Sequence, residues 1–81
     1  MERKKLLELR KKFGLTQNQL GEKLGISTVY VRKLEKGVVN PGRDTLLKYE
    51  LFFDKDMREL FPDIFFDKND KKLIKNNERV I

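Results

Sequence analysis

The chain of 81 residues contains no cysteine and no histidine. Without cysteine, no disulfide framework can stabilise a small fold. Without histidine, the commonest metal ligand and general base is missing, and so are the Ser-His and Cys-His pairs of nucleophilic catalysis. No Gly-Lys-Ser/Thr phosphate-binding loop occurs either. We therefore expect a protein that is not an enzyme and that has no cofactor and no metal site.

Long apolar runs are also missing, since the longest extends over only a few residues. No segment is apolar enough to span a bilayer, and the charged start MERKKLLELRKK lacks the apolar core of a signal peptide. We expect a soluble cytoplasmic protein at the nucleoid, with a native start at Met1. The acidic run DKNDK lacks the glycine and the final glutamate of a calcium loop, so we interpret it as solvated surface.

Positive charge is in excess, with a formal net charge of +6. Residues 1–40 contain ten Lys or Arg and four Glu, a net of +6, whereas residues 41–81 contain nine basic and nine acidic residues. A positive surface on one part of a small domain attracts a polyanion through counterion release. Charge alone is equally typical of an ordinary solvated surface.

The first half of the sequence predicts three short helices that end at glycines. Residues 2–13 place apolar side chains at three- and four-residue spacings. Thr16 caps a second helix that ends at Gly25, and Ser27 caps a third that runs to Gly37. Five basic residues of the first helix either add attraction for phosphate or form its solvated face, and we favour the solvated face: Arg3, Lys4, Lys5, Lys11 and Lys12.

The second half predicts two more helices. Residues 38–43 form a turn around an Asn-Pro-Gly sequence. Asp44 or Thr45 then caps a fourth helix, which is too apolar for an exposed position. Asp56 caps a short fifth helix that Pro62 ends.

The most informative stretch is residues 17–36. Two helices that cross steeply at a tight turn need apolar contacts, a small residue at the close approach and a glycine where the chain reverses. Gly21 supplies the close approach and Gly25 the reversal. The apolar contacts come from Leu20, Leu24, Ile26, Val31 and Leu34.

The sequence LRKKFGLTQNQLGEKLGISTVYVRKLEKG, continued by NPGRDTLLKYELFFDKDMRELF, resembles the phage Cro and repressor family of helix-turn-helix regulators, also called the xenobiotic-response-element (XRE) family. The resemblance covers about residues 5–61. It implies an all-α, compact five-helix domain whose third helix enters the major groove of double-stranded DNA. It also implies a repressor that acts as a homodimer on a palindromic operator.

The third helix is expected to read base edges. If Val31 and Leu34 point inward, the opposite face is exposed. We expect bases to be read by Thr28, Val29, Arg32 and Lys33. Arg32 or Lys33 can donate to guanine O6 and N7, and Val29 can contact a thymine methyl group, although a scattered surface valine is also common.

Phosphate contacts are expected on both sides of the reading helix. The N-terminus of the second helix presents N–H groups and a positive dipole end, and the resemblance implies a phosphate contact for Gln17. Arg43 contacts either a phosphate or the adjacent minor groove. The full set of expected phosphate ligands is Thr16, Gln17, Ser27, Lys36, Asn40 and Arg43.

The resemblance also implies an ion pair between Arg10 of the first helix and Glu35 at the end of the third. We assign this pair to structure, because losing one partner of a buried pair is costly. It fixes the first helix against the reading helix and does not contact DNA.

The residues after Pro62 depart from the family's pattern and lose helical periodicity. Residues 64–66 predict a short strand, followed by a turn at residues 68–70. We divide the chain into a helix-turn-helix domain, residues 1–62, and a short irregular or β-like C-terminal extension, residues 63–81. The extension is either a dimerisation arm or a disordered tail.

Two alternatives stay open. The chain can be an antitoxin-type autorepressor of a toxin–antitoxin pair, or its helix-turn-helix fold can serve as a protein-interaction module. Residues 49–66 contain five of the six Phe residues, which we interpret as core plus dimer interface. A toxin or an anti-repressor is the expected protein partner, and no membrane partner is expected.

Overall fold

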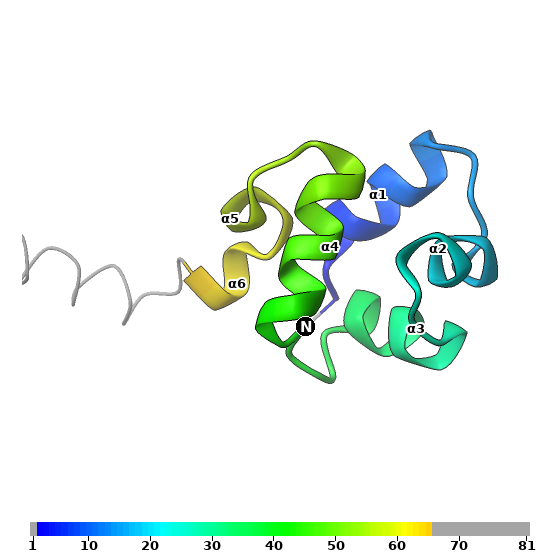
Figure 1. Ribbon diagram of the computed structural model, residues 1–81. Helices are drawn as coiled ribbons and strands as arrows, with labels where there is room; N and C mark the ends of the chain where they lie inside the picture. Colours follow the sequence, from blue (N-terminus) through cyan, green and yellow to red (C-terminus); the bar gives the residue numbers. More distant parts are fainter. Residues whose placement is uncertain (1, 66–81) are drawn as a thin grey trace, which may run out of the picture.

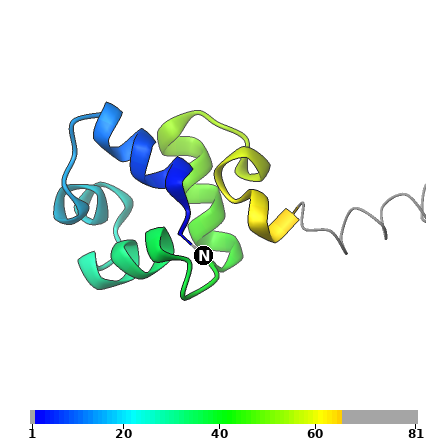
Figure 2. The ribbon, with the colours of Figure 1, turned by 180° about the vertical axis from the view of Figure 1, so that it is seen from behind.

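The computed structural model describes residues 2–65, and this part of the chain contains six helices and no strand. The helices are α1 (Lys4–Lys12), α2 (Gln17–Leu24), α3 (Thr28–Lys36), α4 (Arg43–Phe53), α5 (Met57–Leu60) and α6 (Pro62–Phe65). Helices α2 and α3 lie at one end of the molecule and α5 and α6 at the other, with α1 and α4 between them (Figures 1 and 2). No helix of the described part is long and apolar enough to cross a membrane. The all-α prediction is therefore confirmed.

Side chains and glycines set the ends of α2 and α3 as the sequence predicts. The Thr16 hydroxyl accepts a hydrogen bond from the Gln19 N–H, and the Gln19 side chain accepts one from the Thr16 N–H, which completes a capping box. The Ser27 hydroxyl caps α3 by accepting a hydrogen bond from the Tyr30 N–H. Gly25 and Gly37 end the two helices with φ values of 71° and 77°, a region in which only glycine avoids a steric penalty.

The start of α4 differs from the prediction. Its N-cap is Gly42, without a side-chain hydrogen bond, so the assignment of the cap to Asp44 or Thr45 is wrong. Asp44 lies in the first turn, where its charge still favours the positive end of the helix dipole. Thr45 is buried, and its hydroxyl lies 3.3 Å from that of Tyr30.

The chain after α5 also differs from the prediction. Pro62 ends α5, as expected, but it is also the first residue of α6. Proline suits this position because its φ is already helical and its missing N–H needs no partner there. Ile64 and Phe65 are therefore helical, and the strand predicted from Ile64 onward is wrong for them. Phe66, the turn at residues 68–70 and the rest of the extension lie outside the described residues.

One hydrophobic core joins α1 to α5. Its fully buried side chains are Leu6, Leu20, Val31, Leu34, Tyr49, Leu60 and Phe61. Six of these side chains lie on helices α1 to α5, and Phe61 lies between α5 and α6. The reading-helix candidate α3 therefore shares one core with the other four of these helices.

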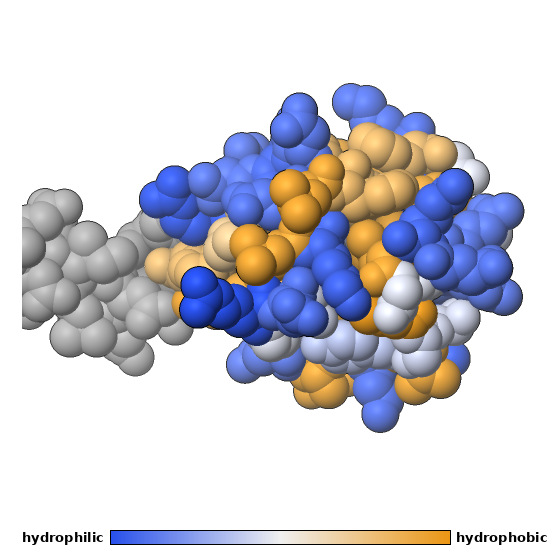
Figure 3. Space-filling model, viewed as in Figure 1, coloured by the Kyte–Doolittle hydropathy of each residue, from blue (hydrophilic) through white to orange (hydrophobic). Residues whose placement is uncertain are grey.

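Helix α4 is less buried than its apolar sequence predicts. Leu51 is 80% exposed and Leu47 is 40% exposed, and they lie one turn apart on the same face. Phe13, at the C-terminal end of α1, is 47% exposed, although its ring packs on those of Phe52 and Phe53. Figure 3 shows apolar side chains gathered over the face where α4 lies.

Candidate nucleic-acid interface

The close approach of α2 to the start of α3 depends on Gly21. A Cβ atom at this position would lie 2.7 Å from the Ile26 carbonyl oxygen. The Ile26 N–H also donates to the Gly21 carbonyl over 2.9 Å, which closes the turn between the helices. The residue type predicted for the close approach is therefore the one that the backbone spacing requires.

One face of α3 is exposed and positively charged. Val31 and Leu34 are buried, whereas Arg32, Lys33 and Lys36 are exposed. The single acidic residue of α3, Glu35, is buried. The exposed charges of this helix are thus all positive, which suits a polyanionic ligand.

The N-terminal end of α3 presents small polar and apolar groups. Val29 is 47% exposed, Ser27 is exposed and Thr28 is half-buried. The Ser27 oxygen accepts the Tyr30 N–H over 3.0 Å, so its O–H is left as a donor. The structure brings the four residues expected to read bases together on one helix. Thr28 is less accessible than the sequence suggested.

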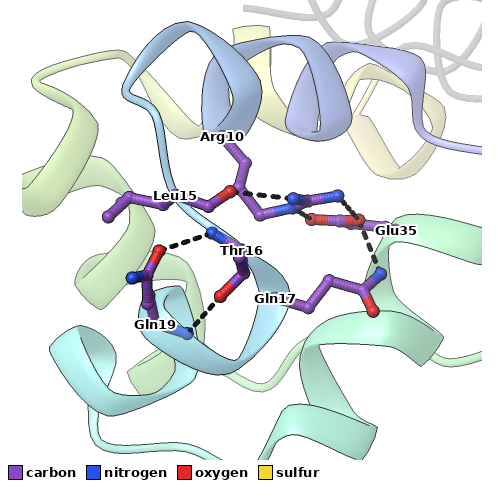
Figure 4. A network of polar contacts seen from close by, with 6 residues as sticks. All are labelled: Arg10, Leu15, Thr16, Gln17, Gln19 and Glu35. Atoms are coloured by element: carbon purple, nitrogen blue, oxygen red, sulfur yellow. Dashed lines mark hydrogen bonds and ion pairs between the residues drawn. The ribbon is translucent and has the colours of Figure 1, made fainter.

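A buried polar network anchors the C-terminal end of α3 (Figure 4). The Arg10 guanidinium donates to both Glu35 carboxylate oxygens, over 2.7 and 3.2 Å, and to the Leu15 carbonyl over 2.9 Å. The Arg10 and Glu35 side chains are only 10% and 4% exposed. Each charge is therefore compensated by a partner in fork geometry, and α1 is tied to α3 as the resemblance implied.

The same network holds Gln17, which was expected only to contact a phosphate. Its Nε2 donates to Glu35 Oε1 over 3.0 Å, and the residue is half-buried (Figure 4). One amide hydrogen and the amide oxygen are left for a ligand. Thr16, beside it, is exposed at the N-terminus of α2. The ion pair thus holds the side chain of one residue that was expected to bind phosphate.

The loop between α3 and α4 and the first residue of α4 each carry one more expected phosphate ligand. Asn40 and Arg43 are both exposed. The Asn40 Oδ1 accepts a hydrogen bond from Arg3 Nη2 over 2.9 Å. Sequence reasoning missed this partner, because it placed Arg3 on the solvated face of the first helix.

Arg3 is in fact buried, with only 4% of its surface exposed. Its guanidinium also donates to the Leu34 and Val39 carbonyls and to the Asp63 carboxylate. The assignment to a solvated face is wrong because Arg3 precedes the first turn of α1 and does not follow its periodicity. No spacing signal in the basic run distinguishes Arg3 from its neighbours.

Comparisons with known proteins agree with this geometry. The helix-turn-helix family model matches residues 6–60. A protein of Archaeoglobus fulgidus, named as an uncharacterized HTH-type transcriptional regulator, is 35% identical over 59 residues, which cover 73% of this chain and 84% of that protein. The solved complex of the SinR and SinI proteins contains a similar chain, with a TM-score of 0.67 and 23% identity over 96% of this chain and 79% of the other. This last likeness shows the fold.

Proposed function

Since the chain belongs to the helix-turn-helix family of transcriptional regulators, the XRE family, we propose that it is a sequence-specific repressor. It binds double-stranded DNA as a homodimer on a palindromic operator, with α3 in the major groove. Residues 1–62 bind DNA, and residues 63–81 form a C-terminal extension.

The exposed face of α3 is the observation that carries this proposal. Arg32 and Lys33 project donors from a helix with no exposed acidic side chain, and Val29 offers an apolar contact. An Arg or Lys that donates to guanine O6 and N7 contributes ~1–3 kcal/mol of discrimination against other bases. Val29 then faces a thymine methyl group, and Thr28 contacts a base edge at the end of the helix.

Phosphate contacts position α3 from both sides. Gln17 and Thr16 hold one strand at the positive end of α2, and Lys36, Asn40 and Arg43 hold the flank on the other side. Ser27 donates from the start of α3. The ion pair of Arg10 and Glu35 orients Gln17 before DNA arrives, which lowers the entropic cost of binding.

Repression follows from occupancy. A dimer bound at its operator excludes RNA polymerase from the overlapping promoter, and this step needs neither a cofactor nor catalysis. The protein acts in the cytoplasm at the nucleoid, and its occupancy depends on its concentration or on a protein partner.

The exposed apolar face of α4 favours protein binding as a second function of the same chain. Leu47 and Leu51 form this face, and the structural neighbour SinR was solved in a complex with the SinI protein. A toxin or an anti-repressor that covers Leu51 would make the chain an antitoxin-type autorepressor or an interaction module. Light scattering of the wild type and of Leu51→Lys tests whether a second copy covers this face instead.

Selection of bound sequences from a pool of random duplex DNA tests the proposed function. We expect a palindromic motif. Arg32→Ala should relax the base preference at one position of the motif. Arg43→Ala should leave the motif unchanged and lower the affinity for all sequences alike. Arg58→Ala, far along the chain in α5, is the matched control and should change neither the motif nor the affinity. Binding without any motif, lost as salt rises, would contradict sequence-specific recognition.

A further inference from the structure

We propose that Arg3 is a positioning residue for DNA binding, which holds the Asn40 amide with its NH2 group toward the phosphate. This inference rests on the proposed function, since it assigns the orientation of one phosphate ligand. Arg3 itself does not contact the nucleic acid, because it is buried.

Arg3 is fixed at the C-terminal end of α3. Its Nη1 donates to the Leu34 carbonyl over 2.7 Å and to the Val39 carbonyl over 2.8 Å, and its backbone N–H donates to the Glu35 carbonyl over 2.7 Å. Carbonyls in the last turn of a helix lack intrahelical donors and carry partial negative charge. The guanidinium therefore joins the end of α3 to the loop that follows it.

A second set of contacts holds Arg3 from the opposite side. The Asp63 carboxylate of α6 accepts from Arg3 Nε over 3.1 and 3.2 Å, and the guanidinium carbon lies 5.4 Å from the centre of the Phe61 ring. These contacts place the fork in one orientation. The Asp63 charge also offsets that of Arg3, so the effect of Arg3 on DNA is exerted through geometry.

The orientation of Asn40 follows from the chemistry of Arg3. Arginine has five N–H donors and no acceptor, so only the oxygen of the Asn40 amide can face it. The NH2 group, with two donors, then points away from Arg3. Phosphate oxygens only accept hydrogen bonds, so the NH2 group is the end of the amide that they require. Without Arg3, the amide can turn and present its oxygen to the phosphate instead.

The test measures whether Arg3 acts through Asn40. Affinities for the selected operator and for an unrelated duplex are measured for the wild type, Arg3→Lys, Asn40→Ala and the double variant, with thermal unfolding of each. We expect Arg3→Lys alone to lower the affinity for both duplexes by about fivefold. When Asn40→Ala is already present, we expect Arg3→Lys to lower the affinity by less than about twofold. Equal weakening in both backgrounds would overturn the proposal. Arg58→Lys, an exposed arginine with a carboxylate partner, is the control.

Asn40→Asp keeps the proposal testable if Arg3→Lys does not fold. The new carboxylate still accepts from Arg3 but has no donor and repels phosphate. We expect thermal stability at least equal to the wild type, and an affinity about tenfold lower for every duplex. Wild-type affinity in this variant would overturn the role of Asn40 and with it that of Arg3. Failure of the wild type to bind any duplex would instead refute the proposed function.

Discussion

Two buried arginines hold the C-terminal end of α3 in different ways. Arg10 pairs with the carboxylate of Glu35, which is almost fully buried, within the first three helices. Arg3 donates mainly to neutral oxygen atoms, and its one carboxylate partner, Asp63, is 29% exposed and lies 60 residues away in the sequence. The first arrangement balances one buried charge against another. The second divides one buried charge among several weak partners.

Two arginines that are similarly buried can therefore contribute differently to stability. When two opposite charges are buried against each other, removal of one leaves the other buried without a compensating charge. A charge shared among carbonyls and a partly exposed acid leaves polar groups that water or neighbouring N–H groups can reach. We therefore expect the helix-turn-helix region around Arg10 to respond to mutation more strongly than the junction around Arg3.

The largest expected effect is that of Arg10→Met. This variant leaves the buried Glu35 carboxylate without its cation, and we expect the free energy of unfolding to fall by about 3–5 kcal/mol. Urea unfolding followed by circular dichroism measures the change. Arg58→Met is the control, because the pair of Arg58 with Asp56 is exposed, and it should leave the unfolding midpoint unchanged. A loss no larger for Arg10→Met than for this control would erase the contrast between buried and exposed arginine pairs.

The next effect is that of Gly21→Val, which tests the backbone contact on the same side of the molecule. Its Cβ would approach the Ile26 carbonyl oxygen to 2.7 Å, so α3 must move relative to α2. We expect a loss of about 1–3 kcal/mol in the free energy of unfolding, together with weaker operator binding. Gly42→Val is the control for a side chain added in open space, since a Cβ there meets nothing within 4 Å, and we expect only the smaller loss that valine causes at the N-cap of α4. Equal losses for the two variants would show that the close approach is not under steric constraint.

Local signals explain what the sequence predicted correctly. Helix α2 begins at Thr16 and ends at Gly25, and helix α3 begins at Ser27 and ends at Gly37. The groups that these caps contact lie within a few residues in the sequence, so their roles can be predicted from spacing. The Arg10 pair could be expected only through the family resemblance. The apolar contacts of α2 and α3 followed from helical periodicity.

Longer-range contacts explain what the sequence did not predict. Arg3 lies in a run of basic residues, and its partners are backbone carbonyls and side chains 31 to 60 residues away. No periodicity carries such information. Pro62 is consistent both with the end of one helix and with the start of another, and only the packing of α6 decides between them. The roles of the exposed residues of α3 toward DNA stay predictions.

A smaller effect is expected for Tyr49→Phe, at a fully buried site in the core. The Tyr49 hydroxyl has no hydrogen-bond partner among the described residues, and the charges of both arginines act on it. Removal of a buried unsatisfied hydroxyl should raise the free energy of unfolding by about 1 kcal/mol. Thermal unfolding at neutral pH measures this gain, and an equal loss would show that the hydroxyl has a stabilising partner.

The same variant has a pH signature. Burial, and then the charge of Glu35, raise the pKa of Tyr49 in the folded protein far above its ordinary value of about 10. The unfolded chain therefore loses this proton first, so stability falls as the pH rises above about 10. We expect Tyr49→Phe to lose less stability than the wild type between neutral pH and pH ~11.

The smallest effect, that of Asp63→Asn, completes the comparison of the two arginines. The amide oxygen can still accept a hydrogen bond from Arg3, whose other partners stay in place, and the lost charge was partly screened by solvent. We expect a loss below about 1 kcal/mol by urea unfolding. Glu35→Gln is the matched variant in the other network, and it should cost more because Arg10 then has no anion in a buried site. If the two carboxylate-to-amide changes cost the same, the Arg3 junction depends on charge as strongly as the Arg10 pair does. The contrast drawn from burial and partner type would then not hold.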